Sequence, residues 1–333
     1  MRVPLHGPFQ FLVFAVLAVA CAGCATSGRP RQDAASAPGQ FPEVTYRQDA
    51  SLMGVTVRQL GEQCGGGLAL VNGLEGIPVG PLKLRDFAYE ALVQHLAAES
   101  GLAFLATPHY FLLYPPEYKA LESLSVATAL PSRYHDIRTT CSFGSGTALY
   151  NVLGVLGTNL GLALVADNVV AEVKCGELFL TEAPLPAVLD AILQSARMSP
   201  QALVVECSDE YIFFRSRSNQ SAPDNLLNPD ALSPEQGRLL EKQVSICLPE
   251  RPESGTQIVV CRAAMTLKAA LPALAAQLGC DVRAAAGLEE LPVNFTVMNR
   301  VRLQSALELL IRQWPIAEFG YEVTADGIVI RRR

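Results

Sequence analysis

The sequence predicts an α+β fold made of three tandem small domains, each with two helices packed on short, mainly antiparallel strands. Three observations support this. One hydrophobic layout occurs three times, in the same order, within 333 residues. Each copy fits the element order βαββαββ and ends in alternating apolar and polar residues, as a hairpin strand does. Each copy spans about 75 to 95 residues, which is enough to close a modest core.

An amphipathic helix comes early in each copy. Its apolar residues recur at spacings of three and four, which places them on one helix face. They are Val57, Leu60 and Cys64, then Leu153, Leu156 and Leu160, then Leu271, Leu274 and Leu278. A short strand follows each helix. It reads LALV at both 68–71 and 162–165, and it spans 280–283 in the third copy.

A second helix repeats one pattern three times. Its apolar residues are Ala88, Ala91, Leu92 and Leu96, then Leu185, Val188, Leu189 and Leu193, then Leu303, Ala306, Leu307 and Ile311. The distance from first-helix leucine to second-helix leucine is 32, 33 and 33 residues, a register that unrelated helices would not keep. The closing strands then point alternate residues inward, namely Phe111 and Leu113, Ile212 and Phe214, Ile328 and Ile330.

The third copy shows the full order of elements. We expect strands at 257–262, 280–283, 293–298, 319–324 and 328–331, with helices at 266–278 and 301–314. The tight turn Ala325-Asp326-Gly327 joins the last two strands. Hairpins mixed with helices are typical of α+β layers.

This third copy resembles the short N-terminal domain shared by secretins and TonB-dependent outer-membrane transducers, the STN-like domain. The matching segments are QIVVCRAAMTLKAALPALAAQLGCDVR, LPVNFTVMNRVRLQSALELLI and FGYEVTADGIVIRR. Residues 303–310 and 326–330 match the family's helix and hairpin most closely. The first two copies look like divergent relatives, in which Pro108-His109 and Asp209-Glu210 replace the Asp-Gly turn. The resemblance implies an architecture and brings no catalytic residues.

The domains are expected at 41–116, 133–215 and 239–333, the last being the best match to the family. Two linkers separate them, 117–132 and 216–238, the second rich in proline and turn-forming Asn and Asp. Within the first linker, residues 118–126 suit a short helix. Residues 21–40 are rich in Ala, Ser, Pro and Gly, which predicts a flexible tether.

Residues 1–20 are expected to be a lipoprotein signal peptide. The apolar run 11–20 is shorter than the roughly 20 residues that span a bilayer. Residues 17–21 resemble a bacterial lipobox, which makes Cys21 the predicted lipidation site; Cys24, or a plain cleavable signal, is the alternative. In such lipoproteins an aspartate after the cysteine favours the inner membrane, and Ala22 stands there instead. The resemblance therefore favours a lipid anchor in the outer membrane, with the protein facing the periplasm.

The net charge of −6, without a basic stripe, argues against a nucleic-acid partner. Half of the residues are apolar, which fits folded domains. Seven cysteines follow Cys24, and export permits disulfides. Cys247 and Cys261 flank a turn-rich segment and are the candidate disulfide. Cys64 lies at a core position of its helix and is expected to be a small buried hydrophobe.

The sequence has no HExxH, Walker or GxSxG motif, so we predict no enzyme activity, no cofactor and no metal site. His95 is expected to be partly buried at the helix position of Ile192 and Leu310. His109 is expected in a hairpin turn and His135 on an opening strand. The loop 144–146 is best explained as a helix entry turn, and Trp314 as core or hinge packing.

The export signal and the absence of catalytic motifs predict a membrane-anchored binding or adaptor lipoprotein, and the resemblance to the STN-like domain implies that it contacts an envelope protein of a secretin-like or TonB-linked system. Open sheet edges suit such contacts. Arg331, Arg332 and Arg333 end the last strand, which we expect at a sheet edge, and they are the predicted partner contact. The alternatives are a self-assembling scaffold, which would be a homo-oligomer, and a hydrolase with a cleft between domains.

Overall fold

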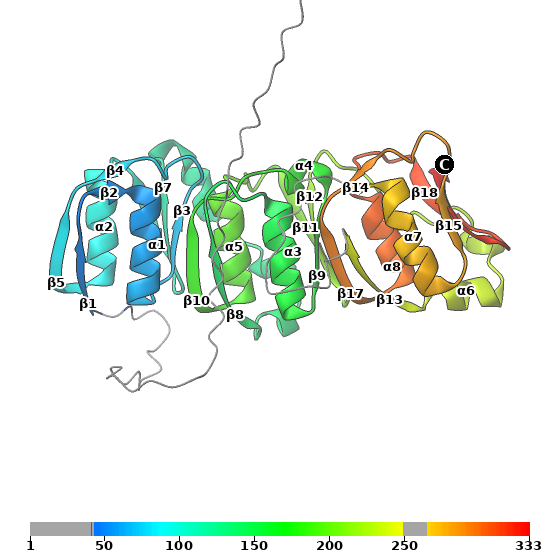
Figure 1. The fold of residues 1–333 in the computed structure, drawn as a ribbon, viewed down its shortest axis with the longest axis horizontal. Coiled ribbons are helices and arrows are strands. Elements are labelled where there is room, and N and C mark those ends of the chain that lie inside the picture. The colour runs from blue at the N-terminus through cyan, green and yellow to red at the C-terminus, as the bar shows by residue number, and fades with distance from the viewer. Residues whose placement is uncertain (1–40, 42, 249–264) are drawn as a thin grey trace, which may run out of the picture. The chain divides into compact units, whose positions relative to one another are not determined.

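The computed structural model describes residues 41, 43–248 and 265–333, which belong to one compact unit. Cys21, Cys24, Cys261, the predicted signal peptide and the predicted tether lie outside the described residues. The described chain is α+β, as predicted, with the helices and strands of the three copies following one another along the chain (Figure 1).

The first copy contains seven main elements and a short extra strand pair. The strands are β1 (Glu43–Gln48), β2 (Ser51–Leu52), β3 (Leu68–Leu70), β4 (Pro78–Val79), β5 (Leu82–Ala88), β6 (Ala103–Ala106) and β7 (Phe111–Tyr114). The helices are α1 (Met53–Cys64) and α2 (Tyr89–Glu99).

The second copy keeps this order, with a short helix in place of the extra strands. Its strands are β8 (Arg138–Phe143), β9 (Ala163–Ala166), β10 (Leu178–Pro184), β11 (Leu203–Cys207) and β12 (Tyr211–Ser216). Its helices are α3 (Leu149–Leu160), α4 (Asn168–Ala171) and α5 (Leu185–Ser195).

The third copy repeats the first. Its strands are β13 (Gln243–Leu248), β14 (Met265–Thr266), β15 (Asp281–Ala284), β16 (Pro292–Val293), β17 (Thr296–Arg302), β18 (Phe319–Val323) and β19 (Gly327–Arg332). Its helices are α7 (Leu267–Leu278) and α8 (Leu303–Ile311). The opening strand β13 ends at Leu248 and so lies earlier in the sequence than the opening strand that we expected at 257–262. Residues 257–262 themselves lie outside the described residues.

Strand pairing is the same in all three copies. The opening strand pairs antiparallel with the strand before the second helix: β1 with β5, β8 with β10, and β13 with β17. The strand after the first helix pairs parallel with the closing strand, which also pairs antiparallel with its hairpin partner. The resulting orders are β3-β7-β6, β9-β12-β11 and β15-β19-β18. The same strand pairing therefore recurs in the three described copies.

Two backbone features recur at matching positions. Asp86, Glu182 and Arg300 all have positive φ angles, of 49°, 48° and 50°, and each lies near a register shift between the opening strand and its partner. A non-glycine residue rarely adopts this conformation, so one β-bulge is preserved across the copies. Each first helix ends on a left-handed glycine, Gly65, Gly161 or Gly279, which can take this conformation without a Cβ clash.

The predicted alignment of the second helices was wrong by one residue in the first copy. Ala88 is exposed at the end of β5, and the buried helix position is Tyr89. Tyr89, Leu185 and Leu303 each follow their first-helix leucine, Leu60, Leu156 or Leu274, by 29 residues. The predicted spacings of 32, 33 and 33 arose because the first copy was aligned one residue out.

The LALV tetrapeptides are not equivalent in position. Leu68 pairs with Phe111, whereas the residue of copy two that pairs with the matching Ile212 is Leu164. The second tetrapeptide therefore starts two residues earlier relative to its sheet. Two residues is one strand period, so the same faces are still buried.

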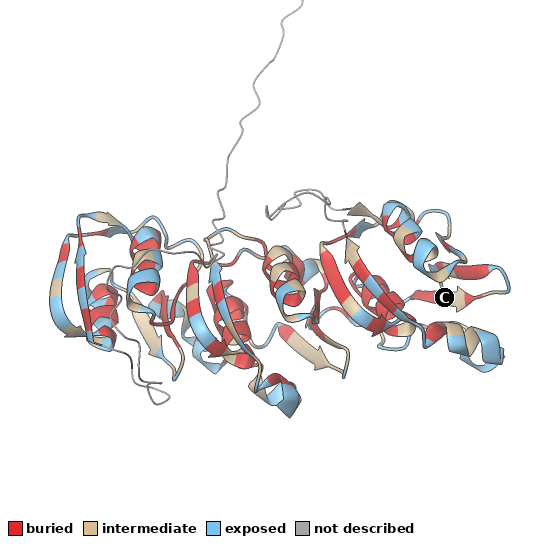
Figure 2. Cartoon of the chain, turned by 60° about the horizontal axis from the view of Figure 1, so that its bottom comes forward, coloured by how far each residue is buried: buried red, intermediate tan, exposed pale blue. Residues whose placement is uncertain are grey.

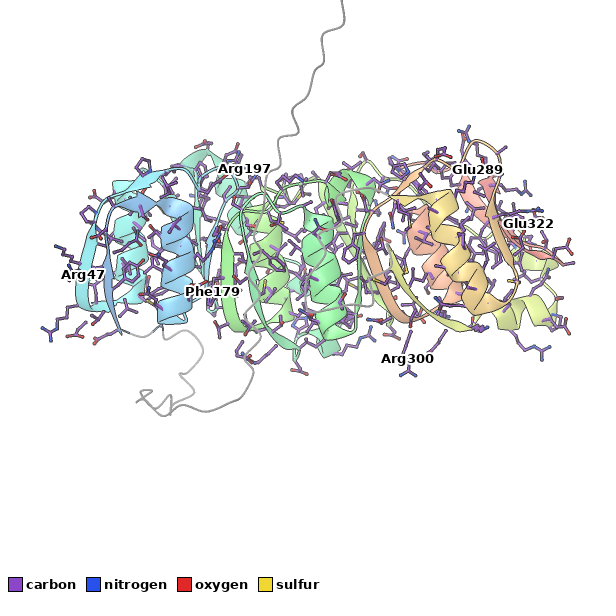
Figure 3. All side chains as sticks on the ribbon, in the orientation of Figure 1. Arg47, Phe179, Arg197, Glu289, Arg300 and Glu322 are labelled. Atoms are coloured by element: carbon purple, nitrogen blue, oxygen red, sulfur yellow. The ribbon has the colours of Figure 1, made fainter. Side chains whose placement is uncertain are left out.

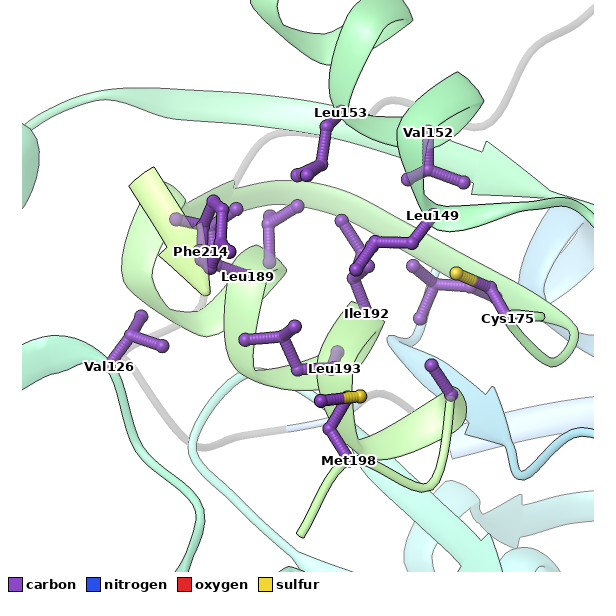
Figure 4. Close-up of a cluster of buried hydrophobic side chains, with 14 of the residues drawn as sticks. Val126, Leu149, Val152, Leu153, Cys175, Leu189, Ile192, Leu193, Met198 and Phe214 are labelled. Carbon is purple, nitrogen blue, oxygen red and sulfur yellow. The ribbon is translucent and has the colours of Figure 1, made fainter. Parts of the chain in front are cut away.

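Both predicted linkers pack against neighbouring copies. The first contains three 3-10 helices, η1 (Pro116–Ser123), η2 (Ala127–Ala129) and η3 (Ser132–Tyr134). Asp190 on α5 holds this segment, because its carboxylate accepts hydrogen bonds from Val126 N at 2.6 Å and Ser125 Oγ at 3.2 Å. The core of copy two consequently includes Val126 beside Leu189 and Phe214 (Figure 4).

The second linker is not a solvated spacer, which corrects the sequence interpretation. It forms η4 (Pro229–Ala231) and α6 (Pro234–Leu240), and Asn219 and Asn225 are buried. Leu226 forms a parallel bridge to Tyr321 on β18. Figure 2 shows the buried residues gathered on the helices and on the strands that face them. Trp314 packs in the third core, edge-on to Phe319, as predicted.

Candidate interaction surface

The junction between copies one and two is a shared sheet. Strand β3 of copy one pairs antiparallel with β10 of copy two, at Leu68 with Phe179 and at Ala69 with Leu178. The result is a five-stranded sheet in the order β6-β7-β3-β10-β8. At the second junction, Ala163, Val165 and Phe213 of copy two are buried in the core of copy three.

The first helix of one copy touches the next copy at matching positions. At the first junction Arg58 on α1 forms an ion pair with Glu177, with Nε and Oε1 2.7 Å apart. At the second junction the equivalent residues are Gly154 on α3 and Phe295, and a Cβ at Gly154 would clash with the Phe295 ring. Two different chemistries therefore occupy one contact position of the repeat.

Gly61 provides a second contact of this kind. Phe179 on β10 lies against α1 (Figure 3), and a Cβ at Gly61 would lie 2.5 Å from its ring. A side chain at this helix position would therefore push the two copies apart.

One backbone hydrogen bond occurs at both junctions. Asn72 N donates to Ser195 O at 2.8 Å, and Asn168 N donates to Gln313 O at 2.8 Å. Both donors follow the first-helix leucine by 12 residues, and both acceptors follow the start of the second helix by 10. Ser195 and Gln313 are fully buried. This shared bond fixes the end of a second helix against the preceding copy in the same way twice.

A buried charge adds to the second junction. Arg312 has no solvent exposure, bonds Glu206 through Nη2, and lies over the Phe213 ring with its guanidinium carbon 4.5 Å from the ring centroid. Burial raises the pKa of Glu206, but hydrogen bonds from Arg312 and Arg215 outweigh it and hold that pKa below its usual value. Among the described residues, Nε and Nη1 of Arg312 have no hydrogen-bond partner.

The third copy ends in a charged sheet face. We call its outward residues on β15, β18 and β19 the terminal face: Arg283, Glu322, Val329 and Arg331. The positions of Arg283 and Val329 match Ala69 and Leu112 in copy one and Val165 and Phe213 in copy two, all four of which are buried by the next copy. In copy three they are exposed or half-buried. Within the described chain no further copy covers this face.

The terminal arginines lie beside this face, but not on an edge strand. Strand β19 pairs on both sides, with β15 and β18, so the predicted sheet edge for Arg331, Arg332 and Arg333 was wrong. All three side chains are exposed. Arg331 forms an ion pair with Glu322, with Nη2 and Oε2 2.8 Å apart; Glu322 is labelled in Figure 3. Arg333 Nη2 donates a hydrogen bond to Asp224 O at 2.7 Å.

Two shallow hollows flank these arginines. One, of about 290 Å³, is lined by Leu226, Leu227, Arg331 and Arg333. The other, of about 230 Å³, is lined by residues 285–288 and Arg332. Both hollows lie at the low end of the size range of ordinary ligand pockets, which is roughly 300 to 1,000 Å³.

The predicted histidines are scattered. His95 is exposed, which corrects the expected partial burial. His109 lies in the β6–β7 turn, as expected, and burial with the nearby charge of Arg138 lowers its pKa. His135 caps η3, with its Nε2 3.2 Å from Leu130 O, and does not lie on β8. Among the described residues, no group of three or more His, Cys, Asp or Glu side chains is placed to hold a metal ion.

The cysteine and loop predictions have mixed outcomes. Cys64 is only half-buried, and burial raises the pKa of its thiol. The Cys247–Cys261 disulfide stays a prediction, because Cys261 lies outside the described residues. The loop 144–146 precedes α3, as expected, and Ser145 N donates to Glu177 Oε2 at 3.1 Å. The Glu177 carboxylate thus accepts a backbone N–H of this loop.

Comparison of the chain with protein-family models, curated proteins and solved structures gave no match. In the described part of the chain, no helix is long and apolar enough to cross a membrane.

Proposed function

We propose that this protein is a membrane-anchored periplasmic binding or adaptor lipoprotein, whose three tandem STN-like domains contact a partner of a secretin-like or TonB-linked envelope system. The observation that carries the proposal is the βαββαββ order, present three times with the same strand pairing. This is the order that the resemblance of the third copy implies. The proposed domains are 41–116, 133–215 and 239–333.

The terminal face and the three arginines beside it are the proposed contact site. The other two copies bury the matching sheet face against a neighbour, whereas copy three presents charge there. Exposed arginines at the rim of a contact chiefly raise the association rate and make it depend on salt.

The anchor is proposed at Cys21, and changing Cys21 to Ser should abolish acyl labelling, whereas the Cys24→Ser control should keep it.

Site-specific photo-crosslinking in intact envelopes tests the contact site. The photoreactive residue replaces Val329 on the terminal face or, as a control, the exposed Lys119 on η1. We expect a discrete product from position 329 only, and mass spectrometry should identify a secretin-like or TonB-linked protein in it. The same products from both positions, or none from 329, would contradict the proposed site.

A further inference from the structure

Each internal junction has two halves, and within the described residues copies one and three each retain one half that pairs with no neighbouring copy. The first half is the strand after a first helix with the residues that follow it, as in β3 and Asn72. The second half is the strand before a second helix with the end of that helix, as in β10 and Ser195. Copy three retains an unused first half, β15 and Ala286. Copy one retains an unused second half, β5 and Glu99.

The sequence positions match those of the internal junctions. Ala286 follows Leu274 by 12 residues, the spacing of the donors Asn72 and Asn168. Glu99 follows Tyr89 by 10 residues, the spacing of the acceptors Ser195 and Gln313. Within the described chain, no hydrogen bond uses Ala286 N or Glu99 O, and both residues are exposed.

The shape and the strand edges agree with this match. The 230 Å³ hollow of copy three is formed by residues 285–288 and Arg332, around the position where the internal junctions hold the end of a second helix. Among the described strands, β15 pairs only with β19, and β5 only with β1. Joining these free edges would give the order β18-β19-β15-β5-β1, which repeats the sheet β6-β7-β3-β10-β8.

The charges at the two halves are complementary at the hollow. The C-terminal end of α2 carries the partial negative charge of a helix end together with Glu99, and Arg332 lines the hollow. The strand contact is weaker than inside the chain, because exposed Lys83 stands at the position of Phe179. The contact should therefore be reversible.

We propose that molecules of this protein associate head to tail. The end of α2 of one molecule lies in the hollow at Ala286 and Arg332 of a second molecule, and β5 of the first lies beside β15 of the second. Because each molecule of such a pair still has one free half, the contact is heterologous and allows further molecules to add.

Cysteine pairing in mixtures tests this register. Glu99→Cys and Ala286→Cys variants of the full chain are prepared separately, then mixed with a short bifunctional maleimide. We expect a covalent dimer in the mixture and none above background with either variant alone. Asp326→Cys, in the exposed turn of the same copy, replaces Ala286→Cys in the control mixture, and the unsubstituted chain gives the background from native cysteines. No dimer, or equal dimer in the control mixture, would overturn the proposal.

A charge exchange provides the second readout. Arg332→Glu should weaken self-association about fivefold in sedimentation velocity, which corresponds to about 1 kcal/mol for an exposed charge pair. Mixing it with Glu99→Lys should restore association between the two variants. Unchanged association of Arg332→Glu would count against the hollow. The head-to-tail contact and the proposed partner contact use the same end of copy three, and the photo-crosslink from Val329 distinguishes them. A product that contains another envelope protein supports the proposed function, whereas a product of two molecules of this chain supports the head-to-tail contact.

Discussion

Arg312 is a fully buried charge between copies two and three, and it has only one strong partner. Its Nη2 bonds Glu206, which also pairs with Arg215, and the Phe213 ring covers the guanidinium. A buried ion pair gains little over an apolar replacement, but loss of one partner leaves an uncompensated buried group. Arg312 therefore holds the junction in register more than it adds net stability.

We expect Arg312→Ala to lower the free energy of unfolding by about 3–5 kcal/mol, because it leaves both a cavity and a poorly paired Glu206. Arg312→Met with Glu206→Gln fills the space and removes the charge, so it should cost clearly less. Urea denaturation followed by circular dichroism measures both. Equal losses for the two variants would show that neither the cavity nor the poorly paired Glu206 accounts for the loss.

Glu308 on α8 should make stability depend on pH. Burial raises its pKa to about 7, although Gln304 donates a hydrogen bond to its carboxylate at 2.9 Å. The charged and polar groups that act on it are Asp224 from the second linker, Arg302, Arg312 and Tyr321. A buried carboxyl with a raised pKa keeps its proton in the folded state, whereas the same carboxyl ionises near pH 4.5 in the unfolded state. The fold therefore loses stability as pH rises from about 4.5 to 7.

The Glu308→Gln variant should accordingly be more stable than the parent at pH 8, by about 1–3 kcal/mol, and equally stable near pH 4. The difference should develop between about pH 4.5 and 7. Denaturant unfolding at a series of pH values measures it. A constant difference across this range would mean that Glu308 titrates normally.

Single residues were predicted best where the helix register was correct. Leu60, Leu156 and Leu274 are all buried, as their spacing indicated. His95 failed because Ala88 and Ala91 imitate the apolar pattern of the true positions, Tyr89 and Leu92. One residue turns a helix by about 100°, which is enough to move a side chain from core to solvent.

At the scale of elements, the contact of α1 with β10 depends on a missing side chain. Gly61→Ala should cost about 1–3 kcal/mol, because the new Cβ meets the Phe179 ring. The added substitution Phe179→Ala should make the Gly61→Ala change nearly neutral. A double-mutant cycle in urea measures this coupling. Additive losses would place the strain elsewhere than at Phe179.

The second linker is expected to stabilise copy three. Fragments 217–333 and 239–333 should both unfold cooperatively, and the longer one should be more stable because Leu227 N donates to Tyr321 O at 2.8 Å and Leu226 packs on that core. Thermal unfolding of the two fragments compares them. A shorter fragment with equal stability would return the linker to the role of a simple spacer.

The order of elements was predictable, and their lateral partners were not. Period-two and period-three-to-four patterns identify strands and helices, but they do not say which strand lies beside which. Strand β19 looked like an edge because it ends the chain, yet β15 pairs with it in parallel after a helix. The second linker looked solvated because its composition is polar. Asn219 is nevertheless buried, since its amide donates hydrogen bonds to Asp167 and to Arg312 O, which composition cannot reveal.

At the scale of the whole molecule, the recurring pairing of the described strands agrees with the hydrophobic spacing of the sequence, whereas the junctions could not be predicted from it. Arg58 with Glu177 and Gly154 with Phe295 occupy one position with unlike residues, so residue identity gave no signal. The sequence predicted the arginines of the candidate site. It did not predict the charged face beside them, because only the structure shows that Arg283 and Val329 occupy the positions of buried residues in the other copies.

The central claim is that the protein acts through the terminal face and its arginines, and partner capture at varied salt tests this most directly. The full chain with Arg331, Arg332 and Arg333 all changed to Ser is compared with a control that loses the same charge at the exposed Arg47, Arg85 and Arg217. We predict slower capture of the photo-crosslinked partner and a flatter salt dependence for the first variant only, with a nearly unchanged melting temperature. Parent-like capture by the first variant at every salt concentration would contradict the account.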